Sequence, residues 1–137
     1  MRNFILPFLV LISACCFGQQ LHKETLFGVH LITVELKPGA TIEQFRDFFV
    51  KEVLPDYEKH WKGLKGYLVK SARGPSKNKF AVMWVFDTEA VRDRYFNADG
   101  TANELEKAAL EKVKPIEQKL ARYGTYTVEY MDDWVVQ

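Results

Sequence analysis

Residues 28–61 read GVHLITVELKPGATIEQFRDFFVKEVLPDYEKHW, and this stretch decides the fold that the sequence predicts. Residues 29–36 are rich in β-branched and aliphatic side chains, which predicts a strand that ends at Pro38 and Gly39. Thr41 and Gln44 then have the spacing of a helix capping box. The apolar residues of the following helix recur at helical spacing: Ile42, Phe45, Phe49 and Val53. A strand that leads into an amphipathic helix is the first half of a sheet covered by helices.

The rest of the chain supplies the remaining elements. Pro55 interrupts the first helix, so a fresh start is expected near Leu54. Strands at residues 67–72 and 80–86 are joined by a Gly-Pro turn as a hairpin. A short helix capped by residue 87 or 88 is followed by a longer helix, and residues 125–130 predict a last strand that residues 131–137 can continue.

The longer helix that follows the short one has its own predicted boundaries. Thr101 and Glu104 have capping-box spacing at its start. Gly124 is expected just past its end, where a left-handed residue often follows a helix. The predicted apolar stripe consists of Leu105, Ala109, Val113, Ile116 and Leu120.

The order of elements predicts an α+β fold with four antiparallel strands and helices on one face, in a split βαβ arrangement. One face of the sheet packs against the helices, and the other would be polar if it met water. Residues 80–86 are nevertheless apolar at both alternating sets of positions. A second copy of the chain is the expected cover for the second face, so we expect a homodimer.

The N-terminus predicts export from the cytoplasm. A short basic start, an apolar run and small residues form a secretory signal peptide at residues 1–18. Two cleavage sites fit equally well: after Gly18, or before Cys15 in a lipoprotein-type motif that would place a lipid on Cys15. Residues 19–26 are expected to be a flexible lead, and residues 27–137 the folded domain. The expected location is extracytoplasmic, in the periplasm, secreted or lipid-anchored to the envelope.

The amino-acid composition limits the kinds of partner that the chain is expected to bind. Of the 137 residues 47% are hydrophobic and 14% aromatic, enough for a core without disulfides. Both cysteines lie at the signal, and removal of its one arginine leaves a formally neutral domain with interspersed charges. We therefore expect no nucleic-acid binding, and membrane attachment only through a lipid on Cys15. The scattered histidines show no metal-ligand spacing, so neither a metal nor a cofactor is expected.

The sequence resembles the dimeric α+β barrel superfamily, whose protomers are ferredoxin-like and pair sheet to sheet. The resemblance covers roughly residues 27–130 and is carried by residues 30–39, the Pro55 break, the turn at residues 63–66 and the segment at residues 84–90. It implies the fold and no single activity, because the superfamily includes cofactor-free monooxygenases, haem-degrading enzymes, isomerases and cyclases. Cyclase-like and haem-degrading members use a histidine in the later helical region. Residues 87–122 of this chain contain none.

Two residues are candidates for catalysis. His30 has the same strand parity as Ile32 and Val34, so it can transfer protons in a pocket between sheet and helices, or form a structural hydrogen bond in the core. Within the resemblance, Tyr95 can take the place of the catalytic tyrosine of cyclase-like members.

Trp84, Tyr67 and Tyr126 are candidates to line an aromatic pocket, with ordinary core packing as the alternative. Arg73, Arg92 and Arg94 can hold a carboxylate or can simply be solvated. The reading favoured by these residues is an exported α+β barrel protein that binds a small hydrophobic or aromatic molecule. The alternatives are a cofactor-independent monooxygenase or isomerase, and a non-catalytic dimeric structural or interaction module.

Overall fold

The computed structural model describes residues 21–137. The predicted signal peptide, both cysteines and the first two residues of the predicted lead lie outside this part of the chain. The elements in chain order are the strand β1 (Leu26–Leu36), the helices α1 (Ile42–Phe48), η1 (Phe49–Val53, a π-helical turn) and α2 (Leu54–His60), the strands β2 (Leu64–Lys70) and β3 (Phe80–Phe86), the helices α3 (Glu89–Arg92) and α4 (Glu104–Leu120), and the strand β4 (Gly124–Val135).

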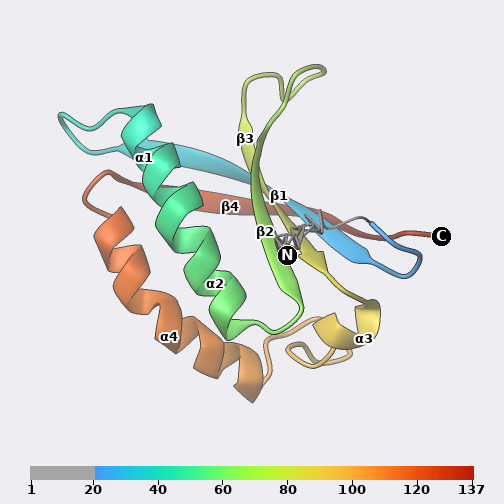
Figure 1. The fold of residues 1–137 in the computed structure, drawn as a ribbon. Coiled ribbons are helices and arrows are strands. Elements are labelled where there is room, and N and C mark those ends of the chain that lie inside the picture. The colour runs from blue at the N-terminus through green and yellow to red at the C-terminus, as the bar shows by residue number, and fades with distance from the viewer. Residues whose placement is uncertain (1–20) are drawn as a thin grey trace, which may run out of the picture.

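The four strands form one antiparallel sheet in the order β2-β3-β1-β4. Figure 1 shows α1, α2 and α4 together on one face of this sheet, with α3 near the end of β3. This is the ferredoxin-like split βαβ topology, so the predicted fold class is confirmed. Among residues 21–137, no helix has the length and apolar character needed to cross a membrane.

The first helical region follows the local signals in the sequence. The Thr41 hydroxyl accepts a hydrogen bond from the Gln44 N–H at 3.2 Å, and the Gln44 side chain accepts one from the Thr41 N–H at 2.9 Å. The capping box is therefore confirmed. The expected fresh start is also confirmed, because α2 begins at Leu54 with Pro55 in its first turn, where proline needs no N–H partner.

Three of the four strands are longer or shifted relative to the prediction. β2 spans residues 64–70 instead of 67–72, β3 matches the prediction, and β4 continues through the predicted tail to Val135. Leu26 is the first residue of β1, so this strand includes one residue that the sequence assigned to the lead. Glu24 and Val136 are joined by a backbone hydrogen bond of 2.8 Å, which ties the start of the described chain to its end.

Three predictions around α4 were wrong. Asn103 caps the helix in place of Thr101, because its side-chain oxygen accepts hydrogen bonds from the N–H groups of residues 105 and 106. The buried stripe therefore starts at Glu106, which is 8% exposed, whereas Leu105 is 47% exposed. Gly124 is the first residue of β4 and not a helix cap; a Cβ there would lie 2.6 Å from the carbonyl oxygen of Glu35 on β1.

The core between sheet and helices has two halves. One half lies under α1 and η1 and contains Ile32, Phe45, Phe49, Val53, Leu54, Val82 and Leu120. The other lies toward the end of α2 and the start of α4 and contains Leu26, Trp61, Leu64, Phe86, Tyr95, Ala109 and Val113. The candidate site is in this second half.

Candidate functional site

A cavity of about 380 Å³ opens between the sheet and the elements around the second half of the core. Strands β1, β3 and β4 contribute its floor, α2 and the first turns of α4 contribute one wall, and residues 92–100 contribute another. The aromatic lining residues are Tyr57, Trp61, Trp84, Phe86, Phe96 and Tyr130. The charged or titratable ones are His30, Arg92, Glu106 and Asp133.

The aromatic wall is a stack of three rings. Tyr57 of α2 and Trp61, the residue just past the end of α2, have ring centroids 5.0 Å apart and planes 8° from parallel. Trp84 of β3 packs on Tyr57 with centroids 5.3 Å apart and planes at 25°. Gly66 on β2 leaves room for Trp84, since a Cβ at this position would lie 2.6 Å from the indole. Because Tyr57 is the middle ring, the stack offers a planar ligand its ring edges and the outer faces of the two indoles.

Glu117 of α4 holds the aromatic wall in place through two hydrogen bonds. Its carboxylate accepts hydrogen bonds from the Tyr57 hydroxyl at 2.9 Å and from the Tyr126 hydroxyl at 3.0 Å. Burial, together with the neighbouring charge of Glu117, raises the pKa of both tyrosines well above the usual value. Both hydroxyls therefore stay protonated as donors, and the Tyr57 ring is held against the two indoles.

His30 and Asp133 lie together on the floor of the cavity. A Cβ on Gly28 would lie 2.5 Å from an Asp133 carboxylate oxygen and 3.3 Å from His30 Nε2, so both side chains occupy the space beside this glycine. Burial lowers the pKa of His30 and outweighs the opposing effect of the Asp133 charge. The imidazole is therefore neutral near pH 7 and can accept a proton.

A β-bulge brings Asp133 into the cavity. β1 and β4 pair Val29 with Asp132 but His30 with Tyr130, so Met131 is an extra residue on β4. If Met131 instead paired regularly with Val29, strict alternation would place Asp132 opposite Gly28 on the cavity side. The bulge re-aims the strand so that Asp133, opposite Gly28, takes this position.

Glu106 is the second buried carboxyl group of the cavity. It accepts a short hydrogen bond from the Trp61 indole N–H. Burial raises the pKa of Glu106, although this hydrogen bond and the charge of Arg92 act in the opposite direction. The carboxyl group therefore retains its proton to a higher pH than an exposed glutamate does.

The structure brings two of the five predicted site residues into the cavity, His30 and Trp84. Tyr95 is buried in the core, and its hydroxyl accepts a hydrogen bond from the Lys62 N–H at 2.7 Å. Tyr126 packs edge-on against Phe45 and Phe49 in the other half of the core. Neither tyrosine lines the cavity. The catalytic role of Tyr95 and the ligand-binding role of Tyr126 therefore stay predictions.

Tyr67 lies on the other face of the sheet, because its neighbour Gly66 faces the helix side. Of the three arginines considered as anion ligands, only Arg92 lines the cavity.

Glu106 and Asp133 were missed by sequence reasoning. Glu106 lies outside the apolar stripe that the sequence predicted for this helix, and the position of Asp133 depends on a bulge that leaves no clear local signal. Within residues 21–137, no group of three or more potential metal ligands converges.

No protein-family model matches the chain, and a search of curated proteins finds no match. Solved structures do show similarity. A NIPSNAP family protein of unknown function from Agrobacterium tumefaciens is 15% identical with a TM-score of 0.47, covering 84% of this chain and 92% of the other. A point mutant of SnoaB, a cofactor-independent oxygenase from Streptomyces nogalater, is 16% identical with a TM-score of 0.43, covering 80% and 92%.

A third similar structure is a dimeric protein of unknown function with a ferredoxin-like fold from Bacteroides fragilis, which is 14% identical with a TM-score of 0.38 and covers 82% of this chain and 97% of its own. Each of these similarities has a TM-score below 0.5. The fold assignment itself rests on the strand order of this chain, and the activity of the chain does not follow from any of them.

Proposed function

We propose that the chain binds a small planar hydrophobic or aromatic molecule in the cavity beside the Tyr57–Trp61–Trp84 stack. The observation that carries the proposal is this ring stack at the edge of a largely apolar cavity with a few convergent polar groups. The volume of about 380 Å³ lies within the range of roughly 300–1,000 Å³ that is usual for small-molecule sites.

Calorimetric titration of the mature domain with two-ring aromatic probes tests the proposal. The probes are 2-naphthoate and 2-naphthalenemethanol. The matched variants are Trp84→Leu, in the cavity wall, and Trp134→Leu, whose side chain is 56% exposed and lies outside the lining. We expect saturable binding that Trp84→Leu abolishes and Trp134→Leu retains. Melting temperatures show whether each variant is folded. Absence of saturable binding in the wild-type domain, or equal binding by both variants, would refute the proposal.

His30 favours a second candidate function, that of a cofactor-independent monooxygenase or isomerase. A neutral imidazole in an apolar cavity can remove an acidic C–H proton from a bound aromatic ketone. The resulting carbanion can react with O₂, so that one oxygen atom becomes a carbonyl and the other leaves as water. In an isomerase, the proton instead returns to a different carbon.

Anthrone is a suitable probe for this activity. Its oxidation to anthraquinone consumes one O₂ and releases one water, and O₂ uptake measures the rate. We expect uptake above the protein-free rate that His30→Gln abolishes without changing the melting temperature. Under nitrogen, His30-dependent hydrogen–deuterium exchange without oxidation would favour the isomerase. Rates equal to the protein-free blank in both assays would leave ligand binding as the sole function of the cavity.

We propose that the second face of the sheet pairs with the same face of another copy. The support is the apolar character of alternate positions on three adjacent strands: Phe27, Val29 and Leu31 of β1, Ala81, Met83 and Val85 of β3, and Val69 of β2. Native mass spectrometry would then give a dimer for the wild type. Val69→Lys should shift it to monomer, whereas Leu105→Lys, an exposed control on α4, should not. A monomeric wild-type domain would refute the pairing.

Export remains a proposal based on residues 1–18. Cell fractionation of the full-length chain would place it outside the cytoplasm, and Cys15→Ser would release it from the membrane fraction if cleavage occurs before Cys15. An unprocessed cytoplasmic chain would contradict the proposal.

A further inference from the structure

Arg92 is the cationic side chain that faces the cavity. It is the last residue of α3, which Thr88 caps through a hydrogen bond of 3.2 Å from the Val91 N–H. Its guanidinium carbon lies 4.4 Å from the centre of the Phe96 ring, a cation–π distance, and its side chain is 22% exposed. The group is therefore held in place at the edge of the cavity before any ligand arrives.

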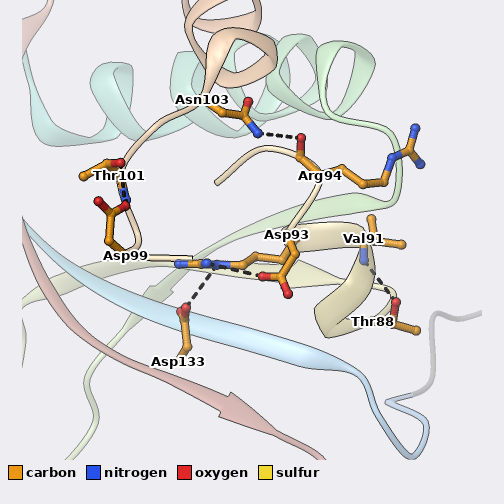
Figure 2. Close-up of polar contacts among 9 residues, drawn as sticks. Thr88, Val91, Asp93, Arg94, Asp99, Thr101, Asn103 and Asp133 are labelled. Atoms are coloured by element: carbon orange, nitrogen blue, oxygen red, sulfur yellow. Dashed lines mark hydrogen bonds and ion pairs between the residues drawn. The ribbon is translucent and has the colours of Figure 1, made fainter. Parts of the chain in front are cut away.

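The carboxylates around Arg92 do not use its full donor capacity. Nε lies 3.5 Å from Asp133 and one terminal nitrogen lies 3.5 Å from Asp93 (Figure 2). Within residues 21–137 these are its two ion-pair contacts, and both are single and long. A guanidinium has five N–H donors and binds a carboxylate best through two parallel bonds of about 2.7–2.9 Å. Arg92 thus retains donors for a further acceptor.

Among the titratable side chains that line the cavity, Arg92 is the one suited to bind an anionic group of a ligand. His30 is neutral near pH 7, and the raised pKa of Glu106 favours its uncharged form. Asp133 is 26% exposed and already faces Arg92. Arg92 is therefore the one cation that an anionic ligand would meet among the described residues that line this aromatic cavity. A cationic ligand would be placed beside the guanidinium and repelled.

We propose that the ligand is a planar aromatic acid, with a carboxylate or ionised enol bound by Arg92 and its ring against the Tyr57–Trp84 wall. This inference rests on the proposed function, because it names the ligand class of the same cavity. The ligand acceptor takes the donors of Arg92 that face the cavity, and the Asp133 and Asp93 contacts keep the guanidinium in position. Arg92 is then the residue that determines specificity.

The test compares probes that share one ring system and differ in charge. Calorimetry at pH 7.5 uses 2-naphthoate, neutral 2-naphthalenemethanol and cationic 2-naphthylmethylammonium. The variants are Arg92→Gln, Arg92→Lys and Arg94→Gln. Arg94 is the matched control, because its side chain is exposed, lies outside the cavity lining and points away from Asp133 in Figure 2.

We expect the wild-type domain to bind the carboxylate at least tenfold more tightly than the alcohol. Arg92→Gln should reduce this preference to about onefold while the alcohol keeps its affinity, which also shows that the variant is folded. Arg92→Lys should retain part of the preference because the charge remains without the bidentate geometry. Arg94→Gln should retain all of it.

Equal wild-type affinity for acid and alcohol, a preference that survives Arg92→Gln, or tightest binding of the ammonium would each overturn the inference and leave the ligand-binding function standing. Absence of binding by all three probes would overturn the proposed function and this inference with it. The failures of the two proposals are therefore distinguishable.

Discussion

Replacing Tyr57 and Tyr126 by phenylalanine, singly and together, tests whether Glu117 holds the aromatic wall of the cavity in place. Both hydroxyls donate to the same carboxylate oxygen, at 2.9 and 3.0 Å. Each substitution removes one donor and keeps the ring, so packing is almost unchanged. The three groups come from α2, α4 and β4, and their hydrogen bonds connect two helices to the edge strand of the sheet.

The expected magnitude follows from the charge of the acceptor. A hydrogen bond to a charged group contributes roughly 1.5–3 kcal/mol to stability, and the remaining tyrosine still satisfies the oxygen in each single variant. We therefore expect each single variant to lose about 1.5 kcal/mol in the free energy of unfolding. The double variant leaves a half-buried carboxylate without either donor, and should lose about 1 kcal/mol more than the sum of the single losses.

Urea denaturation followed by circular dichroism measures all four proteins of this double-mutant cycle. Tyr123→Phe is the control, because the Tyr123 ring packs on Phe48 and its hydroxyl has no side-chain hydrogen-bond partner among residues 21–137. Its loss should stay below about 0.5 kcal/mol, as is usual for a change that breaks no such contact. Single losses that add to within about 0.3–0.5 kcal/mol, with unchanged denaturant dependence, would show that the two tyrosines act independently and would refute the clamp.

Three further outcomes are expected from the same geometry. Asp133→Asn should lower the pKa of His30 further, because it removes the charge that opposes the effect of burial, and an NMR titration of the imidazole would show no change if the two groups were independent. The folded pKa of Glu106 is raised above its usual value of 4.5, so the stability of the wild type should decrease as the pH rises from about 4.5 through the raised pKa. Glu106→Gln should abolish this pH-dependent loss of stability. Parallel stability–pH curves for the two proteins would contradict the prediction. Gly66→Ala should cost roughly 1–3 kcal/mol in denaturation experiments, because the new methyl group would lie 2.6 Å from the Trp84 indole, and a wild-type midpoint would show that the indole yields freely.

The sequence was sufficient for features that depend on a few neighbouring residues. The Thr41 capping box, the restart of the helix at Leu54 and the hairpin between β2 and β3 each depend on side chains within about five positions, and each was predicted. The fold class followed from their order. His30 was also predicted to face the helices, because strand parity is local to β1.

The charged groups of the cavity could be predicted only in part, because they depend on contacts between distant elements. Thr101 was the predicted cap of α4, and capping by Asn103 instead accompanies a buried face that includes Glu106 and leaves Leu105 exposed. A glutamate is acceptable there because the Trp61 indole, 45 positions away in sequence, supplies a hydrogen bond. Asp133 was missed for a similar reason, since its direction depends on the register between β4 and β1.

The cavity and its polar groups have one common origin in the pairing of β1 with β4. Where the first half of the core places Ile32 on β1, the second half has Gly28, which contributes no side chain to fill the space under α2 and α4. The bulge at Met131 then turns Asp133 into this space beside His30. Deleting Met131 should restore simple alternation and keep Asp133 opposite Gly28, because Tyr130 would then be followed directly by Asp132 opposite Val29. Deletion of a bulge residue commonly costs stability as well, so binding of 2-naphthalenemethanol is the necessary check that the cavity persists. If the cavity persists, His30 should titrate as in the wild type, and a changed titration would show that strand register alone does not fix the position of Asp133.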